Sequence, residues 1–176
     1  MTPPGSAGAW PGVSRLLKLD VAASTQEIAR GLAEDGAADG TLVWADRQTR
    51  GRGRLNRRWK SHPGGLYVSL ILKPGFPPSR LADFGLMAAE AAAAGLSALA
   101  GVKTSVKPPN DVLAWDKSGR PRKICGILAQ AAGDSRGLDW LVLGIGVNVN
   151  NEPGLARAAS LQGLTGRRWR TDAVLR

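Results

Sequence analysis

The chain has 176 residues, 43% of them hydrophobic, and it carries a formal net charge of +10 at neutral pH. This length suits one domain and the apolar content can form a core, which excludes wholesale disorder. The one cysteine, Cys125, excludes an internal disulfide and fits a buried strand. No uninterrupted apolar run reaches the roughly 20 residues that span a bilayer. We therefore expect a cytoplasmic protein that is not bound to a membrane.

The chain opens on a stretch rich in glycine, proline and other small residues. We expect residues 1–15 to form a flexible leader to a domain that spans residues 16–176. The first predicted helix runs from Ser24 to about Ala33. Ser24 and Glu27 have the spacing of a capping box, in which two side chains satisfy free backbone N–H groups of the first turn.

Strands and one long helix follow in the middle of the chain. Thr41–Ala45 predicts a short strand, and Leu66–Leu72 predicts a second one, bounded by glycine and proline. Leu81–Ala100 is rich in alanine and contains no proline, which predicts a long helix. Thr104–Lys107 predicts a strand that ends at the two prolines after it.

Hairpin strands dominate the second half. Val112–Trp115 and Lys123–Gln130 flank a polar turn and predict a hairpin. Trp140–Val149 predicts another strand, residues 151–166 predict a loop with one helical turn, and a last helix is expected to begin at Thr171. The strands do not alternate regularly with helices, which indicates an α+β fold, a mixed β-sheet flanked by helices, rather than a doubly wound fold.

Residues 47–60, here called the basic loop, are the most informative part of the sequence. They hold seven basic residues and no acidic one. Glycine lets a backbone approach a ligand closely, and the planar fork of arginine binds phosphate or carboxylate. Trp59 adds a face for a flat ring. We expect this loop to close over a phosphorylated or carboxylated molecule.

Three further segments combine polar residues with a constrained backbone. Asn110 and Asp111 follow two prolines, Lys123–Leu128 is apolar after its lysine, and Gly144–Asn150 alternates small and polar residues. Taken singly, the first segment favours an ordinary turn, the second fits a solvated strand end, and the third fits a bulge at the sheet edge. In the last of them, we expect the two asparagines to share one strand face, where an amide pair could contact a base edge.

The common nucleotide-binding patterns are absent from the sequence. Residues 51–56 and 144–149 each begin like a dinucleotide loop but lack the third glycine, and no Walker loop is present. If a nucleotide binds this chain, another arrangement holds it.

Together, these segments resemble one family, the biotin–protein ligases. The similarity spans most of residues 20–165 in the family's order. It is carried by Gly51–Arg54 with Arg57 and Trp59, by Pro109–Asp111, by Lys123–Leu128 and by Gly144–Asn150. Jointly these elements are specific, although each alone is ambiguous.

The resemblance implies a catalytic domain like that of the class II aminoacyl-tRNA synthetases and a reaction in two steps. Biotin and ATP, with Mg²⁺, give biotinyl-5′-AMP and pyrophosphate. A lysine of a biotin carboxyl carrier domain then attacks this mixed anhydride and forms an amide. The carrier domain is therefore the expected partner, a homodimer is compatible with the family, and no specific DNA binding is expected.

The resemblance also assigns roles to residues of this chain. Catalysis is expected of Lys123, Arg52 and Arg54, which neutralise charge as a carboxylate meets a phosphate. The expected biotin contacts are Ser24, Thr25, Gln26, Gln48, Gly51, Arg52, Gly53, Arg54, Gly65, Lys123 and Gly126. The expected ATP and adenylate contacts are Arg52, Arg54, Arg57, Trp59, Asn110, Lys123 and Asn148. No residue is assigned to a metal.

The sequence departs from the family pattern in two places. Pro108 stands where the family usually has tryptophan, which removes an aromatic wall and stiffens the backbone. The chain ends at Arg176, where the family continues into a small SH3-like barrel, so we expect a catalytic domain truncated at its C-terminal end. Because few residues precede the match, we expect this chain to lack the DNA-binding domain of some family members.

Three other functions stay open on the sequence alone. A lipoate–protein ligase has a related fold, although Gln48 together with Gly51–Arg54 favours biotin. A basic nucleic-acid-binding module would fit the net charge, but it would interleave aromatic residues with lysine and arginine, and aromatic residues make up only 5% of this chain. The third alternative is an inactive ligase fragment.

Overall fold

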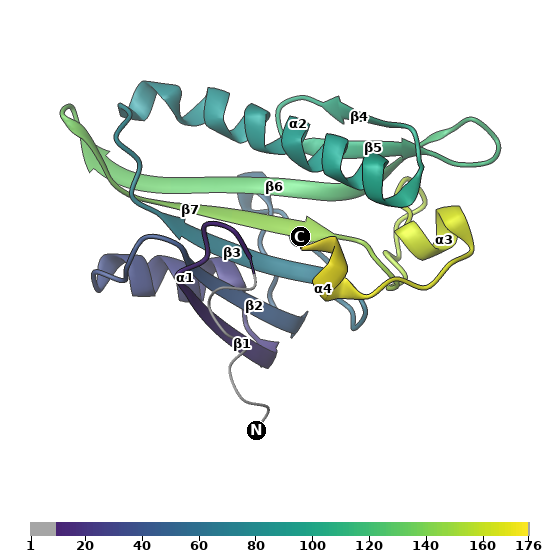
Figure 1. Cartoon of the computed structure of the whole chain (residues 1–176), viewed down its shortest axis with the longest axis horizontal. Coiled ribbons are helices and arrows are strands. Elements are labelled where there is room, and N and C mark those ends of the chain that lie inside the picture. Colours follow the sequence, from purple (N-terminus) through teal and green to yellow (C-terminus); the bar gives the residue numbers. More distant parts are fainter. Residues whose placement is uncertain (1–9, 176) are drawn as a thin grey trace.

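A seven-stranded mixed sheet organises the chain, of which the computed structural model describes residues 10–175 (Figure 1). The strands are β1 (Arg15–Ala22), β2 (Thr41–Gln48), β3 (Leu66–Leu72), β4 (Thr104–Lys107), β5 (Asp111–Trp115), β6 (Pro121–Asp134) and β7 (Gly137–Val147). Their order in the sheet is β1-β2-β3-β7-β6-β5-β4. Only β1 and β2 are parallel, and every other neighbouring pair is antiparallel.

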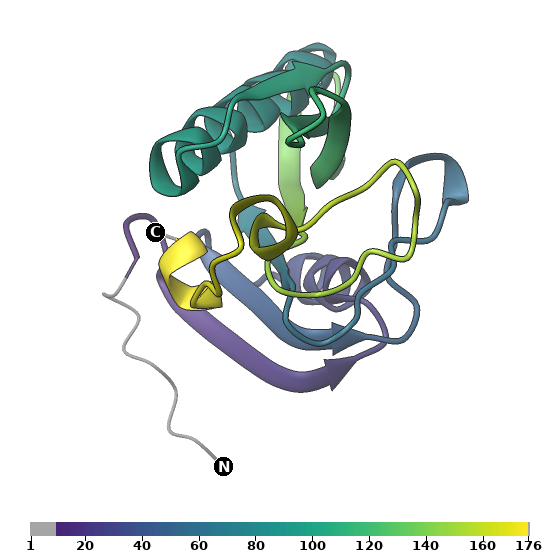
Figure 2. The ribbon, with the colours of Figure 1, turned by 90° about the vertical axis from the view of Figure 1, so that its right-hand side faces the viewer.

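Helices pack on both faces of this sheet, which confirms the predicted α+β fold. They are α1 (Thr25–Glu34), α2 (Leu81–Ala100), α3 (Leu161–Thr165) and α4 (Thr171–Val174), with 3-10 turns at η1 (Arg54–Asn56) and η2 (Pro78–Arg80). Figure 2 shows how strongly the sheet twists between its β1–β2 side and its α2 side.

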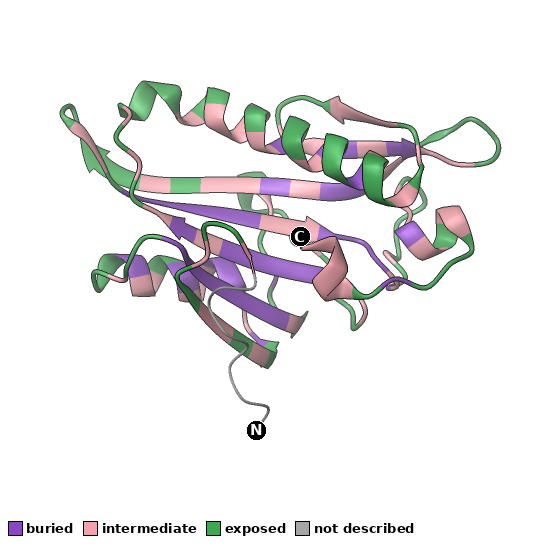
Figure 3. Ribbon diagram, in the orientation of Figure 1, coloured by how far each residue is buried: buried purple, intermediate pink, exposed green. Residues whose placement is uncertain are grey.

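Alternation along the strands divides the core between the two faces. Leu42 and Trp44 of β2 join the cluster beneath α2, whereas Val43 between them packs in the cluster that includes α1. β7 follows the same rule, because Leu141 joins the α2 cluster and Val142 the α1 cluster. The buried residues therefore follow the central strands β2, β3 and β7 (Figure 3).

The sequence analysis did not predict β1. This strand lies at the edge of the sheet. Its residues Leu17–Val21 alternate apolar and charged side chains, a period of two that indicates a strand but that the sequence analysis did not take up. Its parallel pairing with β2, in which Leu17 lies beside Val43, makes it a strand. Trp10 packs edge-on against Trp44, with ring centroids 6.1 Å apart, so ordered packing reaches back beyond residue 16. Residues 1–9 of the expected leader lie outside the described residues.

The end of β7 corrects a second prediction. The strand stops at Val147, so the two asparagines after it do not share a strand face. The side chain of Asn150 donates to the carbonyl of Trp169 at 2.7 Å and accepts from its N–H at 2.9 Å. Asn148 instead accepts from the amide of Asn151 at 3.1 Å. Asn150 thus has a structural role.

Helix α2 bears on the expectation about membrane-spanning length, although Asp83 and Glu90 interrupt its apolar residues. By length and composition, the segment Pro78–Ala100 could cross a membrane. In the structure, α2 lies on β4, β5 and β6, and its buried side is formed by Ala89, Ala93 and Leu96. These are mostly small side chains, which let the helix lie close to the sheet.

The exposed side of α2 offers a test of this packing. Gly95 has no atom within 4 Å of the position that a Cβ would take. We expect Gly95→Ala to raise the free energy of unfolding by about 0.5–1 kcal/mol, because alanine loses less backbone entropy on folding. Urea denaturation measures this change. Gly101→Ala is the contrast, because Gly101 ends the helix at a φ of 65°, where alanine is strained. A loss of stability in Gly95→Ala would show that this face is packed.

Candidate functional site

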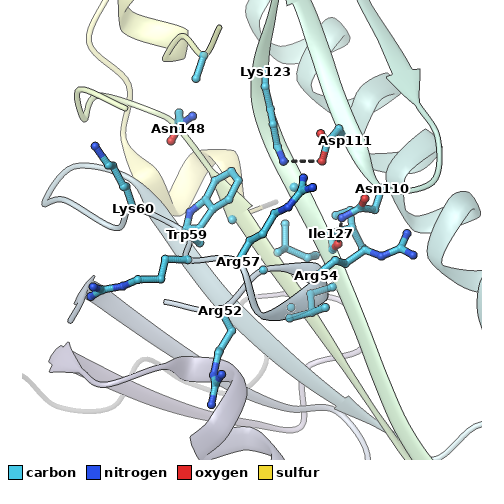
Figure 4. Close-up of a pocket in the computed structure, with 18 of the residues that line it drawn as sticks. Arg52, Arg54, Arg57, Trp59, Lys60, Asn110, Asp111, Lys123, Ile127 and Asn148 are labelled. Atoms are coloured by element: carbon cyan, nitrogen blue, oxygen red, sulfur yellow. Dashed lines mark hydrogen bonds and ion pairs between the residues drawn. The ribbon is translucent and has the colours of Figure 1, made fainter. Parts of the chain in front are cut away.

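A cavity of about 600 Å³ lies on the α1 face of the sheet (Figure 4). Twelve of the residues assigned from the sequence line it: Thr25, Gln26, Gln48, Arg52, Gly53, Arg54, Arg57, Trp59, Asn110, Lys123, Gly126 and Asn148. The other three, Ser24, Gly51 and Gly65, do not line it. The structure thus brings together residues from α1, the basic loop, the turn before β5, strand β6 and the segment just after β7.

Three glycines form a flat floor for the cavity. Gly144 and Gly146 point to the same side of β7, and Gly126 of β6 pairs directly with Gly146. A Cβ on Gly146 would lie 2.7 Å from Cε2 of Trp59, and a Cβ on Gly126 would lie 2.9 Å from Cζ3 of the same ring. A Cβ on Gly144 would collide with Oε1 of Gln26. The close approach that the strand glycines suggested is therefore made by Trp59 and Gln26.

A buried network of neutral polar groups forms one end of the cavity. The backbone N–H and the hydroxyl of Thr25 both donate to Oε1 of Gln48, at 2.8 and 3.1 Å. The amide nitrogen of Gln48 donates to the hydroxyl of Ser61 at 2.8 Å. The hydroxyl of Ser69 lies 3.0 Å from both Thr25 Oγ1 and Gln26 Oε1. The network orients the amides and hydroxyls at this end.

Ser61 and Ser69 bound a segment that also follows the family's order, but the sequence analysis gave neither residue a role in the site. Ser69 carried a signal, because it is the one polar side chain that points inward within the apolar strand Leu66–Leu72 and it is fully buried. Ser61 carried none, because its place depends on an isolated bridge with Gln48 that closes the basic loop.

The predicted capping box is wrong. Ser24 is the N-cap of α1, but its side chain makes no cap hydrogen bond. Its hydroxyl is buried and has no hydrogen-bond partner within the described part of the chain. Glu27 does not reach back to the cap, because its carboxylate accepts from Arg52 instead.

Lys123 forms the opposite, cationic end. Its ammonium lies 2.5 Å from the carboxylate of Asp111 and 5.1 Å from the centroid of the Trp59 ring. A β-bulge in β6 positions the Lys123 side chain. Val112 of β5 pairs with Cys125, whereas the next residue of β5, Leu113, pairs with Lys123, so Ile124 is an extra residue in β6. Since a bulge re-aims the side chains before it, Lys123 shares the cavity face with Gly126.

The loop after β7 fixes the backbone at this lysine. The N–H of Lys123 donates to the carbonyl of Arg157 at 2.9 Å, and its carbonyl accepts from Ala159 at 3.0 Å. The side chain therefore has a defined starting direction. Asp111 was not assigned from the sequence, although it belongs to the conspicuous segment after the two prolines.

The arginines of the basic loop point in different directions. In Figure 4, Arg57 extends toward Lys123, Arg54 runs to the Asn110 side, and Arg52 turns away from both. Nε of Arg52 donates to Oε1 of Glu27 at 2.7 Å, and Nη2 contacts the same oxygen. The structure therefore does not place the Arg52 guanidinium beside Lys123, and a direct catalytic role for Arg52 stays a prediction.

Burial sets the protonation of two further groups. It raises the pKa of the Tyr67 phenol, which lines the cavity and donates to the carbonyl of His62 at 2.7 Å. It also raises the pKa of the Cys125 thiol to about 12. Cys125 belongs to the core on the α2 side, which confirms that it is a buried strand residue.

Comparison with known proteins gives a consistent result. Residues 19–148 match the profile of the family described as Biotin/lipoate A/B protein ligase. The chain is 42% identical over 139 residues to the bifunctional ligase/repressor BirA of Bacillus subtilis. The aligned region covers 78% of this chain and 41% of that protein. It is 33% identical over 140 residues to a biotin--[acetyl-CoA-carboxylase] ligase of Paracoccus denitrificans, of which it spans 56%.

A solved structure has the same fold. The biotin protein ligase of Aquifex aeolicus in complex with biotin and ATP superimposes with a TM-score of 0.76 at 35% identity, over 92% of this chain and 66% of that one. The chain therefore spans about two fifths to two thirds of the relatives that it matches.

Proposed function

Because the chain belongs to the biotin/lipoate A/B protein ligase family, we propose that it activates biotin with ATP to biotinyl-5′-AMP and transfers the biotinyl group to a lysine of a biotin carboxyl carrier domain. One observation carries the choice of substrate: the cavity has a neutral, hydrogen-bonding end and a cationic end. Biotin has the same polarity, with a neutral cyclic urea at one end and a carboxylate at the other.

The floor of the cavity relates the two ends. Gln26 lies against Gly144, and Lys123 lies against Gly126, which pairs with Gly146. Alternate residues of a strand are about 7 Å apart, so a small molecule can reach from one end to the other. In the proposed complex, the urea contacts the network around Thr25 and Gln48, and the carboxylate lies near Lys123.

The first step joins two anions, and the basic residues make that possible. A carboxylate oxygen of biotin attacks the α-phosphorus of ATP, the bond to the β-phosphate oxygen breaks, and pyrophosphate leaves. Lys123 and Arg57 supply fixed positive charge where charge builds up on the phosphoryl oxygens. Arg54 lies near Asn110, on the side where the nucleotide would bind.

The acidic residues limit how the protein could hold Mg²⁺. Among the described residues that line the cavity, Asp111 is the only carboxylate, and the described part of the chain has no group of three metal-ligating residues. Mg²⁺ is commonly held by one or two carboxylates together with substrate phosphates. Asp111 fits a metal that arrives with ATP, and such a metal would neutralise phosphate charge.

The second step needs the adenylate to survive until the acceptor arrives. The lysine amine attacks the carbonyl carbon of the mixed anhydride, an amide forms, and AMP leaves. Water would compete for the same carbon. The basic loop and the Trp59 ring cover the floor of the cavity, and such a cover reduces hydrolysis.

A direct assay tests the proposal. The chain is incubated with ATP, Mg²⁺ and biotin, with and without a biotin carboxyl carrier domain, while pyrophosphate release and acceptor labelling are measured. We expect both signals with biotin and neither with lipoate. If the acceptor were labelled with lipoate and not with biotin, the chain would be assigned as a lipoate ligase instead. If pyrophosphate were released without acceptor labelling, the chain would catalyse only the first step.

A further inference from the structure

We infer that Glu27 is a positioning residue: it holds the basic loop over the cavity through Arg52, so that Arg52 acts through this contact rather than on the substrate. The inference deepens the proposed function. Its catalytic test rests on that function, whereas its structural test does not.

The contact joins two parts of the site that are 25 residues apart in the chain. Glu27 lies in the first turn of α1, directly after Thr25 and Gln26 of the neutral end. Arg52 directs two of its nitrogens to one carboxylate oxygen of Glu27. Among the described residues, this is the only ion pair made by the basic loop. The pair therefore couples the helix that supplies the neutral end to the loop that supplies the cover.

Both ends of the loop are anchored elsewhere, because Gln48 accepts from Thr25 and Lys60 donates to the carbonyl of Gly154 at 3.1 Å. Between them, hydrogen bonds within residues 49–58 shape the loop without joining its tip to α1. The backbones of Arg52 and Arg58 form an isolated antiparallel β-bridge. The N–H of Gly53 donates to the carbonyl of Arg57 at 2.8 Å, and the guanidinium of Arg58 donates to the carbonyl of Thr49 at 2.9 Å. The partners in these inner contacts all belong to the loop itself.

The tip of the loop has little else to hold it. Leu55 has a φ of 53° and is 80% exposed. A branched residue in this left-handed region persists only where its surroundings hold it. The Glu27–Arg52 pair lies just before this turn.

The direction of Arg52 separates the two roles that the residue could have. The guanidinium points away from Lys123 and is engaged by Glu27 (Figure 4). A planar fork that is bound to one carboxylate has less freedom to bind a phosphate with the same two nitrogens. If Arg52 only ties the loop down, exchanging the two charges preserves its role. If it contacts the substrate, the exchange abolishes that role.

The structural test is limited trypsin digestion of the unliganded chain. Cleavage after Arg54, Arg57 and Arg58 is followed by mass spectrometry. We expect Glu27→Gln and Arg52→Gln each to speed this cleavage about fivefold. The double variant Glu27→Arg/Arg52→Glu should return it to within about twofold of the wild-type rate. Unchanged cleavage in the single variants, or no recovery in the exchange, would overturn the inference.

The catalytic test measures biotinyl-AMP formation in the same variants. We expect about a fivefold loss in Glu27→Gln and recovery in the charge exchange. Recovered protection from trypsin without recovered activity would also overturn the inference, because Arg52 would then contact the substrate. The matched control exchanges Arg30 and Glu34, an exposed pair 2.8 Å apart on the same helix, and should leave both rates unchanged. If wild type makes no adenylate, the proposed function fails, and the trypsin result still decides whether the pair holds the loop.

Discussion

Replacing Lys123 with alanine is expected to slow biotinyl-AMP formation on the order of 100-fold, which corresponds to about 2.7 kcal/mol of transition-state stabilisation. The ammonium is held by Asp111 at 2.5 Å and lies over the Trp59 ring at the cationic end of the cavity. Its loss removes a fixed positive charge from the place where a carboxylate meets a phosphate. Pyrophosphate release at saturating biotin and ATP measures the effect.

The control for Lys123→Ala is Lys103→Ala. Lys103 also lies over an indole, 5.3 Å from the Trp115 centroid, but it does not line the cavity. We expect its replacement to leave the rate within about twofold of wild type. Lys123→Ala also leaves Asp111 without its cation, so thermal denaturation is needed to confirm that the variant is folded. A folded Lys123→Ala variant with an unchanged rate would remove this lysine from the mechanism.

Gly146→Ala is expected to lower the rate of biotinyl-AMP formation on the order of 100-fold. The substitution removes no charge, but it displaces the Trp59 ring that packs on the glycine floor. The added Cβ would lie 2.7 Å from Cε2 of Trp59, closer than real contacts allow. The Trp59 ring also lies against Gly126, so the floor has no second place to which the ring could shift. We expect the ring to leave the glycine floor and the basic loop to move with it.

Two comparisons show whether Trp59 causes this loss. Gly95→Ala adds the same methyl group where nothing lies within 4 Å, and it should not change the rate. Trp59→Ala and the double variant Gly146→Ala/Trp59→Ala should have equal rates, because the clash is absent once the ring is removed. A further loss in the double variant would show that the floor itself, and not the ring, is what the methyl group disturbs.

Local patterns predicted most of the secondary structure. Leu81–Ala100 forms the predicted helix, because alanine has the highest intrinsic helix propensity and the segment is rich in it. β1 was missed although Leu17–Val21 alternates apolar and charged residues; only its parallel partner, β2, which begins 26 residues later in the chain, leaves no local trace. The same limit explains Asn150: its partner, Trp169, is 19 residues away and leaves no local trace.

The candidate site could be predicted as a set of residues but not as an arrangement. Glycines, arginines and a tryptophan in one loop indicate by their chemistry alone that an anion and a flat ring are bound. The direction of each side chain is a different property. One extra residue at Ile124 brings Lys123 to the cavity face, and one carboxylate on α1 turns Arg52 away from it. Both depend on strand register and on contacts between distant segments, because a shift of one residue reverses the face of a strand. Residue types therefore follow from the chain itself, whereas their directions come from the packing of the whole domain.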